Sequence, residues 1–302
     1  MRPRRFLYWI AGFILLTGLS TRSISAQEAS ASQTVPALLN LQIGDRFVIR
    51  LQDGGQIVGE LKQETPDELT LTTSFGEVKI ARSKVKELTR ITARDIHGGE
   101  YWYPDPNQTR AFVFPTASTL ASGKGFYENY YLLFHSVHVG LTDNAMFSAG
   151  VALFPEGGKI LTVGPKLRVY QNRTKTIEAA VGAHLFVAAG DDEAGKAFIP
   201  YGALSLGRPN QGRLNIGAGG IAVEGESALF LNLSGDARLS RQVKAMGEVF
   251  LFSVDGETRA FPIYGLRFFS EKLAFDLGFW NIPDEKDLTP IGTPLVNFVF
   301  RF

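Results

Sequence analysis

The sequence contains no cysteine among its 302 residues. This absence excludes a disulfide framework, a thiol nucleophile and a thiolate metal site. Four histidines leave few imidazole ligands, so we expect no bound metal and no other cofactor. A helical membrane span after the N-terminal segment is excluded as well. Such a span needs roughly 18 uncharged residues, whereas the longest uncharged run after residue 26, residues 129–142, has 14.

An excess of charge of either sign is also missing. The chain carries 31 basic and 30 acidic residues. Four of the arginines lie within the first 26 residues, namely Arg2, Arg4, Arg5 and Arg22. Without them, 27 basic residues stand against 30 acidic residues, a net charge of −3. Domains that bind nucleic acid through their charge are strongly basic, so we expect no nucleic-acid partner.

The first 26 residues have the pattern of a secretory signal peptide. Three arginines precede a mostly apolar run over residues 6–20, and the small residues 23–26 offer a cleavage site. A retained N-terminal anchor helix is the alternative interpretation. Residues 27–37 are small and polar, which is typical of a flexible leader.

Residues 38–95 predict a small β-domain. Glycine, proline and aspartate at positions 53–55, 66–67 and 75–76 supply the turns between short alternating segments. The expected strands cover residues 46–51, 56–63, 68–73, 77–80 and 85–89. Their order resembles the small barrels of Sm-like and SH3-like domains, and this resemblance implies a closed five-stranded barrel.

The RNA-binding property of Sm proteins does not carry over to this domain. Their signature contains Arg-Gly late in the fold, where this chain has the sequence ARSK at residues 81–84. Nine acidic and nine basic residues balance between Leu38 and Asp95, so no face attracts phosphate. We therefore interpret residues 38–95 as a packing or protein-interaction module.

Residues 96–109 form a connection rich in glycine, proline and aromatic residues. Tyr101, Trp102 and Tyr103 within it allow two interpretations. They could form a platform for a carbohydrate or another ligand. We favour the second interpretation, in which amphipathic aromatic side chains lie at a water–lipid boundary or pack the two domains together.

Residues 110–302 predict a transmembrane antiparallel β-barrel. Segments of 9 to 16 residues alternate between apolar side chains on one face and mostly Gly, Ala, Ser and Thr on the other. This composition is typical of strands that face lipid on one side and a lumen on the other. Such a sheet must close, because unpaired backbone groups are too costly in hydrocarbon. We count about twelve segments, the first near residue 110, or ten if residues 110–115 only connect.

The C-terminal segment is the most specific feature of the sequence. Val296, Phe298, Phe300 and Phe302 share one face, and the sequence ends on this phenylalanine. This pattern resembles the C-terminal assembly signal of bacterial outer-membrane β-barrels. The resemblance implies that the barrel assembly machinery is a partner and that outer-membrane lipid surrounds the barrel.

The segments at residues 99–117 and 125–144 extend this resemblance. Together with the small domain, they resemble a group of uncharacterised bacterial outer-membrane β-barrel proteins with an N-terminal Sm-like or SH3-like small barrel. The resemblance to that group implies no activity for this chain. The fold class we expect is therefore all-β, with a small five-stranded barrel followed by a transmembrane barrel of 10 to 12 strands.

Charged residues on the inward faces are the candidate functional residues. If each apolar face is outward, the lumen contains Lys166, Arg168, Glu178, Arg213, Asp236, Glu248, Arg259, Arg267, Asp276 and Arg301. Basic residues are in modest excess in this set, and such an excess favours anions in a narrow pore. Alternatively, opposite charges pair across the lumen and close it.

Catalytic groups are weakly indicated. His135, Ser136 and His138 invite comparison with outer-membrane lipid hydrolases, but neighbouring residues of a strand point to opposite faces. His135 therefore reaches neither Ser136 nor His138. The sequence GAGG at residues 217–220 lies in a strand pattern with no following helix, so it does not predict a phosphate loop. We expect no enzymatic activity.

Two main functions remain open. The first is a passive pore or transport component with a weak anion preference. The second is a non-conducting structural or interaction protein whose barrel anchors the small domain, which then meets a partner in the periplasm. A barrel lipid hydrolase is a distant third. In each case the expected location is the bacterial outer membrane, with the small domain in the periplasm.

Deleting Phe302 should lower the amount of assembled barrel in the outer membrane while export continues, because the insertion machinery loses the terminal aromatic residue. Gel mobility of unboiled membrane samples measures the assembled fraction, and periplasmic extracts measure export. Unchanged assembly would show that the likeness to an assembly signal is accidental.

Overall fold

The structure is a computed structural model that describes residues 41–302 apart from 155–157, 190–194, 224, 255–256 and 282–291. The expected signal peptide (1–26) and leader (27–37) lie outside the described residues. The chain divides into two compact units, one ending at Tyr103 and the other beginning at Pro104. In the part of the chain that is described, no helix is long and apolar enough to cross a membrane.

The first unit contains a five-stranded antiparallel sheet with the strand order β4-β3-β2-β1-β5. Its strands are β1 (Arg46–Leu51), β2 (Gln56–Glu64), β3 (Glu68–Thr73), β4 (Gly76–Ala81) and β5 (Val85–Ile91). The 3-10 helix η1 (Arg82–Lys84) joins the two edge strands. All five strands expected from the sequence are confirmed, with ends that differ by at most two residues. Closure of the sheet into a barrel stays a prediction.

One face of this sheet packs into an apolar core and the other carries paired charges. Buried members of the core are Phe47, Ile49, Leu61, Leu69, Leu71, Ile80 and Val85. On the other face, Arg46 lies 3.6 Å from Glu60. Arg50 lies 3.3 Å from Glu87 on the adjacent strand. Because opposite charges meet across neighbouring strands, these residues form no one-signed patch.

The expected connection at residues 96–109 is divided between the two units. In the first unit, η2 (Ala93–Asp95) leads into the short strands β6 (Ile96–His97) and β7 (Glu100–Tyr101). The rings of His97 and Trp102 lie 4.3 Å apart. Trp102 therefore packs within its own unit.

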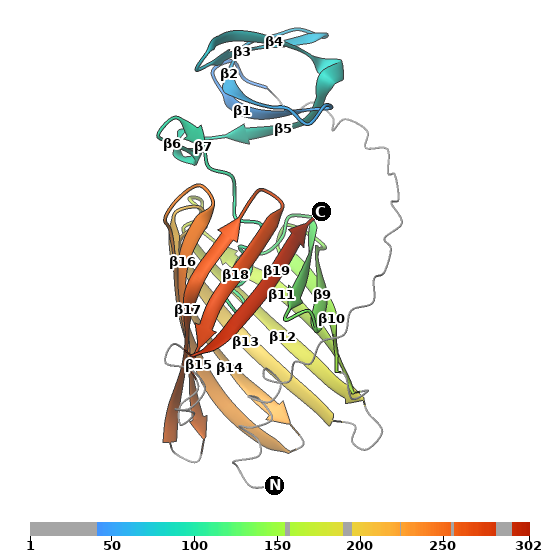
Figure 1. The fold of residues 1–302 in the computed structure, drawn as a ribbon, viewed down its shortest axis with the longest axis vertical. Coiled ribbons are helices and arrows are strands. Elements are labelled where there is room, and N and C mark those ends of the chain that lie inside the picture. The colour runs from blue at the N-terminus through green and yellow to red at the C-terminus, as the bar shows by residue number, and fades with distance from the viewer. Residues whose placement is uncertain (1–40, 155–157, 190–194, 224, 255–256, 282–291) are drawn as a thin grey trace. The chain divides into compact units, whose positions relative to one another are not determined.

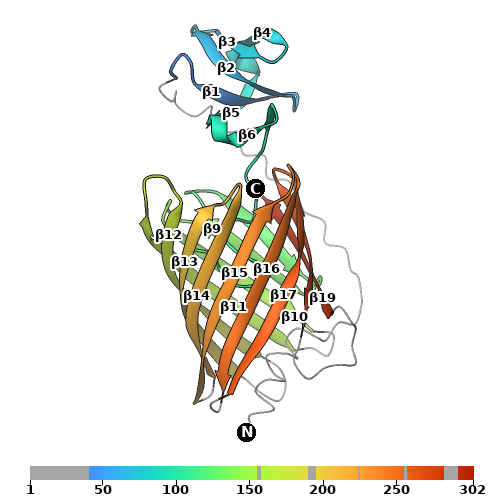
Figure 2. The same cartoon turned by 90° about the vertical axis from the view of Figure 1, so that its left-hand side faces the viewer.

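The second unit is a closed antiparallel barrel of twelve strands, inclined to the barrel axis (Figures 1 and 2). The first six strands are β8 (Gly125–Tyr130), β9 (Phe134–Gly140), β10 (Ala145–Leu153), β11 (Lys159–Gln171), β12 (Ile177–Ala189) and β13 (Gly195–Arg208). The other six are β14 (Gly212–Val223), β15 (Glu226–Arg238), β16 (Val243–Val254), β17 (Glu257–Phe269), β18 (Leu273–Trp280) and β19 (Thr293–Arg301).

The barrel wall begins later than the sequence predicted. The expected first segment near residue 110 is not a strand, since Arg110 and Pro115 form only an isolated bridge. The expected second segment instead supplies both β8 and β9, joined by a tight turn in which Tyr131 and Leu132 have positive φ angles of 54° and 63°. Twelve strands are therefore reached with a different assignment at the N-terminal end.

The barrel closes where β19 pairs with β8. Phe302 N–H donates to Gly125 O at 3.0 Å at the end of this pair. Of the four residues of the expected assembly signal, Phe298, Phe300 and Phe302 are exposed on the outer surface and Val296 is half-buried. Leucine and valine side chains, such as Leu161, Leu229 and Leu231, are likewise exposed outside, so the outer face is apolar.

Replacing Leu71 by Ala in the first unit should lower its free energy of unfolding by ~2–5 kcal/mol, because Leu71 is fully buried. Urea unfolding of residues 38–103 measures the change. The exposed neighbour Thr72 provides the control, and Thr72→Ala should change stability by less than about 1 kcal/mol. Equal losses in the two variants would contradict the assigned core face.

Candidate functional site

Residues 104–120, here called the lumen segment, lie inside the barrel. Three prolines, Pro104, Pro106 and Pro115, lie in this stretch, and a proline cannot donate to a strand ladder. Asp105 accepts a hydrogen bond from Asn107 N–H at 2.8 Å, which forms a local turn. The buried residues of the segment are Asp105, Pro106, Asn107, Thr109, Ala111, Phe112, Phe114, Pro115, Thr116, Ala117, Ser118 and Leu120.

Glu248 on β16 holds the tip of the lumen segment. The tip is a tight turn in which Ala111 N–H donates to Phe114 O at 2.9 Å. Within it, Val113 N–H and Phe114 N–H each donate to one carboxylate oxygen of Glu248 at 2.8 Å. Asn232 Nδ2 on β15 donates to the same carboxylate at 2.9 Å. Three donors therefore compensate a fully enclosed negative charge.

Lys166 on β11 holds the two sides of the same turn. Its Nζ donates to Thr109 O at 3.1 Å and to Thr116 O at 3.2 Å. Nearby, Ala117 N–H donates to Ser205 Oγ on β13 at 2.9 Å. The wall therefore satisfies both amide and carbonyl groups of a segment that forms no ladder of its own.

A second group of contacts fixes the start of the lumen segment. Arg267 on β17 donates to Asp105 at 3.0 Å, to Asp276 at 2.6 Å and to two carbonyl oxygens of the segment. Lys244 Nζ on β16 lies 3.2 Å from Asp105 Oδ2. Burial alone would raise the pKa of Asp105, but Arg267 and Lys244 lower it below its ordinary value. Asp105 is therefore negative at neutral pH.

Arg110 pairs with Glu128 on β8 at 3.5 Å. Burial opposes its charge, but Glu128 raises the pKa of Arg110 above its ordinary value. The other oxygen of Glu128 accepts hydrogen bonds from Asn107 Nδ2 at 3.2 Å and from Asn297 Nδ2 at 3.0 Å. Glu128 thus joins the lumen segment to the strand pair that closes the barrel.

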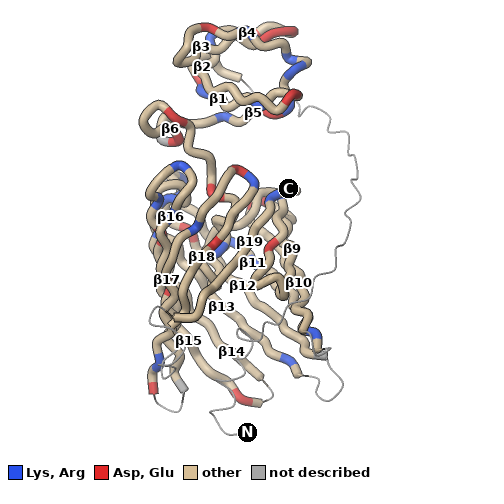
Figure 3. The backbone as a smooth tube through the Cα atoms, in the orientation of Figure 1, with Lys and Arg blue, Asp and Glu red and all other residues tan. Residues whose placement is uncertain are grey.

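The end of the segment meets a further ionic group. Ser118 Oγ donates to Glu178 on β12 at 2.6 Å and accepts from Arg213 on β14 at 3.0 Å. Glu178 also pairs with Arg168 at 3.1 Å, and Arg213 lies 3.4 Å from Asp236. Figure 3 shows that the charged residues of the barrel gather toward the end at which β19 finishes.

Aromatic side chains fill the lumen beside the turn. The ring of Phe114 lies 5.7 Å from that of Phe230 and 6.1 Å from that of Phe250, in edge-on contacts. Room for Phe114 comes from Gly217, where a Cβ atom would lie only 2.1 Å from the ring. The buried cluster comprises Phe112, Phe114, Ala117, Ala180, Tyr201, Ala203, Ile221, Phe230, Met246, Phe250, Phe252, Phe261, Ile263, Trp280 and Leu295.

The structure brings most of the expected lumen residues into one network. Two of them lie outside it. The side chain of Arg259 is 39% exposed and lies beside Glu257, and Arg301 is half-buried at the end of β19. The charged network formed by the lumen segment and the wall contains Arg110, Lys166, Arg168, Arg213, Lys244, Arg267, Asp105, Glu128, Glu178, Asp236, Glu248 and Asp276. These are six basic and six acidic residues, so this network carries no basic excess.

Four members of this network were missed by sequence reasoning. Asp105 lies in the expected connection, and Arg110 begins an expected segment that is not part of the wall. Glu128 lies in the expected second segment, which the structure divides into β8 and β9. Lys244 carried a usable signal, because it is four residues before Glu248 and therefore shares its face.

The histidines lie as the alternation predicted, but one contact was overlooked. Ser136 and His138 are two residues apart and both face inward, and Ser136 Oγ lies 3.0 Å from His138 Nε2. Glu128 Oε2 lies 3.3 Å from the same nitrogen. A catalytic triad needs the carboxylate on the other ring nitrogen. His135 lies on the opposite face of β9, with Nδ1 2.5 Å from Tyr127 Oη.

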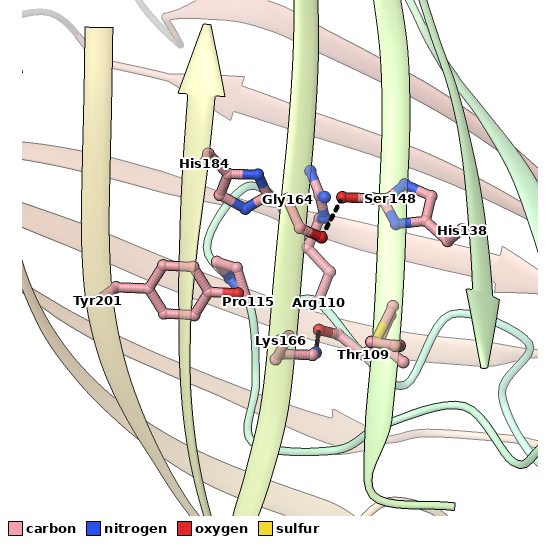
Figure 4. Close-up of a pocket in the computed structure, with 10 residues that line it drawn as sticks. Thr109, Arg110, Pro115, His138, Ser148, Gly164, Lys166, His184 and Tyr201 are labelled. Atoms are coloured by element: carbon pink, nitrogen blue, oxygen red, sulfur yellow. Dashed lines mark hydrogen bonds between the residues drawn. The ribbon is translucent and has the colours of Figure 1, made fainter. Parts of the chain in front are cut away.

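A small polar cavity remains beside the lumen segment (Figure 4). Its lining includes Arg110, Lys166, His184 and Tyr201, and Figure 4 shows these side chains converging from the lumen segment and strands β11, β12 and β13. The cavity has a volume of about 10 Å³, which is room for about one water molecule. Among the described residues, no group of acidic residues, histidines or cysteines could hold a metal ion.

No protein-family model and no curated protein matches the sequence. Salmonella typhi OmpF, in a complex with daunomycin, is a similar solved structure with a TM-score of 0.33 and 10% identity, covering 85% of this chain and 95% of that chain. OccK11 (OpdR) of Pseudomonas aeruginosa gives a TM-score of 0.32 at 10% identity, covering 85% and 93%. A loop L8 deletion mutant of OmpT, an outer membrane protein of Vibrio cholerae, gives 0.32 at 10%, covering 85% and 96%. Scores at this level carry no argument about function.

Replacing Glu248 by Ala should destabilise the folded barrel by on the order of 1–3 kcal/mol for each of the two amide groups left unpaired. Unfolding by denaturant in detergent measures the loss. Glu226, an exposed carboxylate at the start of β15, provides the control, and Glu226→Ala should have little effect. Equal unfolding midpoints for both variants would show that Glu248 does not hold the segment.

Proposed function

We propose that this protein is an outer-membrane β-barrel that does not conduct and that anchors its N-terminal domain at the membrane. One observation carries this proposal: residues 104–120 fill the lumen and bond to the wall on several sides. Glu248, Lys166 and Arg267 each hold backbone groups of this segment. A conducting pore would need these buried contacts to be broken.

Insertion in a membrane is supported by the outer surface of the barrel. A closed sheet leaves no unpaired edge, and exposed leucine, valine and phenylalanine side chains surround it. In water, such a surface would be an aggregation hazard. The signal peptide pattern and the terminal phenylalanine favour the outer membrane in particular, with the barrel assembly machinery and outer-membrane lipid as partners.

The strand order supports our proposal that the small domain lies in the periplasm. β8 begins and β19 ends at the same rim, since Gly125 and Phe302 are bonded to each other. Chain ends of bacterial outer-membrane barrels lie at the periplasmic rim, where the short turns are. The small domain, which we propose to be Sm-like or SH3-like, precedes Pro104 and would therefore face periplasmic partners.

The pore with weak anion preference is the less favoured function. Its anion preference depended on a basic excess in the lumen, and the network is balanced at six basic and six acidic residues. A lipid hydrolase is disfavoured because Ser136 is only 6% exposed. In addition, Ser136 Oγ and the carboxylate of Glu128 both contact the same nitrogen of His138, Nε2. We therefore propose that the protein is not an enzyme.

Single-channel recording in planar bilayers tests the proposal. Wild-type protein should insert without stable conductance steps, and replacing residues 105–118 by a Gly-Ser linker of equal length should produce them. Heat-dependent gel mobility confirms that both proteins are folded. Stable conductance of the wild type would reject the non-conducting barrel in favour of the pore.

A further inference from the structure

The cavity beside the lumen segment is rich in hydrogen-bond donors. His184 and Tyr201 line it and have no hydrogen-bond partner among the described residues. Lys166 has three N–H groups and donates two of them to carbonyl oxygens, which leaves one free. The hydroxyl group of Ser148 donates to Gly164 O at 3.0 Å (Figure 4), so it offers no donor to the cavity. A lysine, a tyrosine and a histidine therefore offer donors to the same small space.

Arginine, lysine and histidine side chains line the cavity, and no carboxylate is among the residues that line it. Arg110 at its edge is neutralised by Glu128. Lys166, by contrast, has no carboxylate within 4.0 Å in the described part of the chain, although it is only 6% exposed. A buried charge without a counter-charge is costly, and the two carbonyl oxygens that Lys166 contacts are neutral.

The wall is shaped to make this space. At Gly164 a Cβ atom would lie 2.4 Å from His184 Nδ1, and at Gly182 it would lie 2.4 Å from Tyr201 Oη. Glycine at these two inward positions lets both polar groups lie directly over the backbone. The ring of His184 stacks on that of Tyr201 at 5.5 Å, which fixes the orientation of both.

We propose that this cavity binds one small monovalent anion, chloride in the first instance, with Lys166 as its counter-charge and Tyr201 and His184 as hydrogen-bond donors. The cavity volume of about 10 Å³ fits an ion near the size of a water molecule and is too small for polyatomic oxyanions. The proposal concerns occupancy of this cavity and not ion flow through the barrel, so it holds or fails independently of the conductance measurement.

Thermal unfolding of the full-length protein in detergent tests the site. At constant sodium concentration, replacing gluconate by chloride should raise the unfolding midpoint of the wild type in a saturable manner, because a ligand of the folded state stabilises it. Lys166→Met should abolish this response. Lys159→Met, on the same strand but exposed, should keep it.

Two further measurements keep the proposal falsifiable if Lys166→Met does not assemble. Tyr201→Phe keeps the ring and removes one donor, so it should raise the half-saturating chloride concentration by roughly 10- to 100-fold, as for one hydrogen bond to a charged group. Crystals grown in bromide should give an anomalous peak between Lys166 Nζ and Tyr201 Oη. Equal midpoints in chloride and gluconate, or a cavity without bromide, would show that it holds water only.

Discussion

The contact between Glu248 and two consecutive amide groups of the lumen segment organises the barrel interior. A carboxylate enclosed by protein is tolerated only when donors surround it, and Val113, Phe114 and Asn232 supply them. Because the amides are held in one place, the flanking rings of Phe112 and Phe114 are directed into the aromatic cluster. The glycine at position 217 then has a clear role, since it leaves space for the Phe114 ring.

Lys166 complements this contact with the opposite charge. It binds carbonyl oxygens at the two sides of the turn, while Glu248 binds amide groups at its tip. Neither residue has an ionic partner in the network, whereas the other ten charged residues of the network meet opposite charges within 4.0 Å. A segment with no regular secondary structure is thus held by backbone recognition at its centre, by ion pairs of Asp105 at its start and by hydrogen bonds of Ser118 at its end.

The strands were predictable because lipid or a core on one face imposes a period of two on the sequence. That constraint is local, so the five strands of the first unit and most strands of the barrel were located within a few residues. The face of each charged wall residue followed from the same period. Arg168, Glu178, Arg213 and Asp276, for example, lie within the network that the inward pattern suggested.

The lumen segment could not be predicted in the same way. Its partners lie far along the chain, with 135 residues between Val113 and Glu248 and 162 between Asp105 and Arg267. No periodic pattern records such contacts. Residues 110–115 contain four consecutive apolar residues and were counted as a possible strand, yet Phe112 and Phe114 pack inside the lumen rather than face lipid. The free donors of His184 and Tyr201 were equally hidden, because strand alternation gives a face but not the distance across a barrel.

The route of the lumen segment has a consequence for the order of assembly. Its start is bound by Lys244 and Arg267, near the rim where β16 begins and β17 ends, and it leaves toward Gly125, at the rim where β8 begins. The segment therefore enters and exits through the same opening and is not threaded along the barrel. Pairing of β19 with β8 does not trap it, so the wall can form first and receive the segment afterwards. The route of the segment thus places no topological constraint on barrel closure.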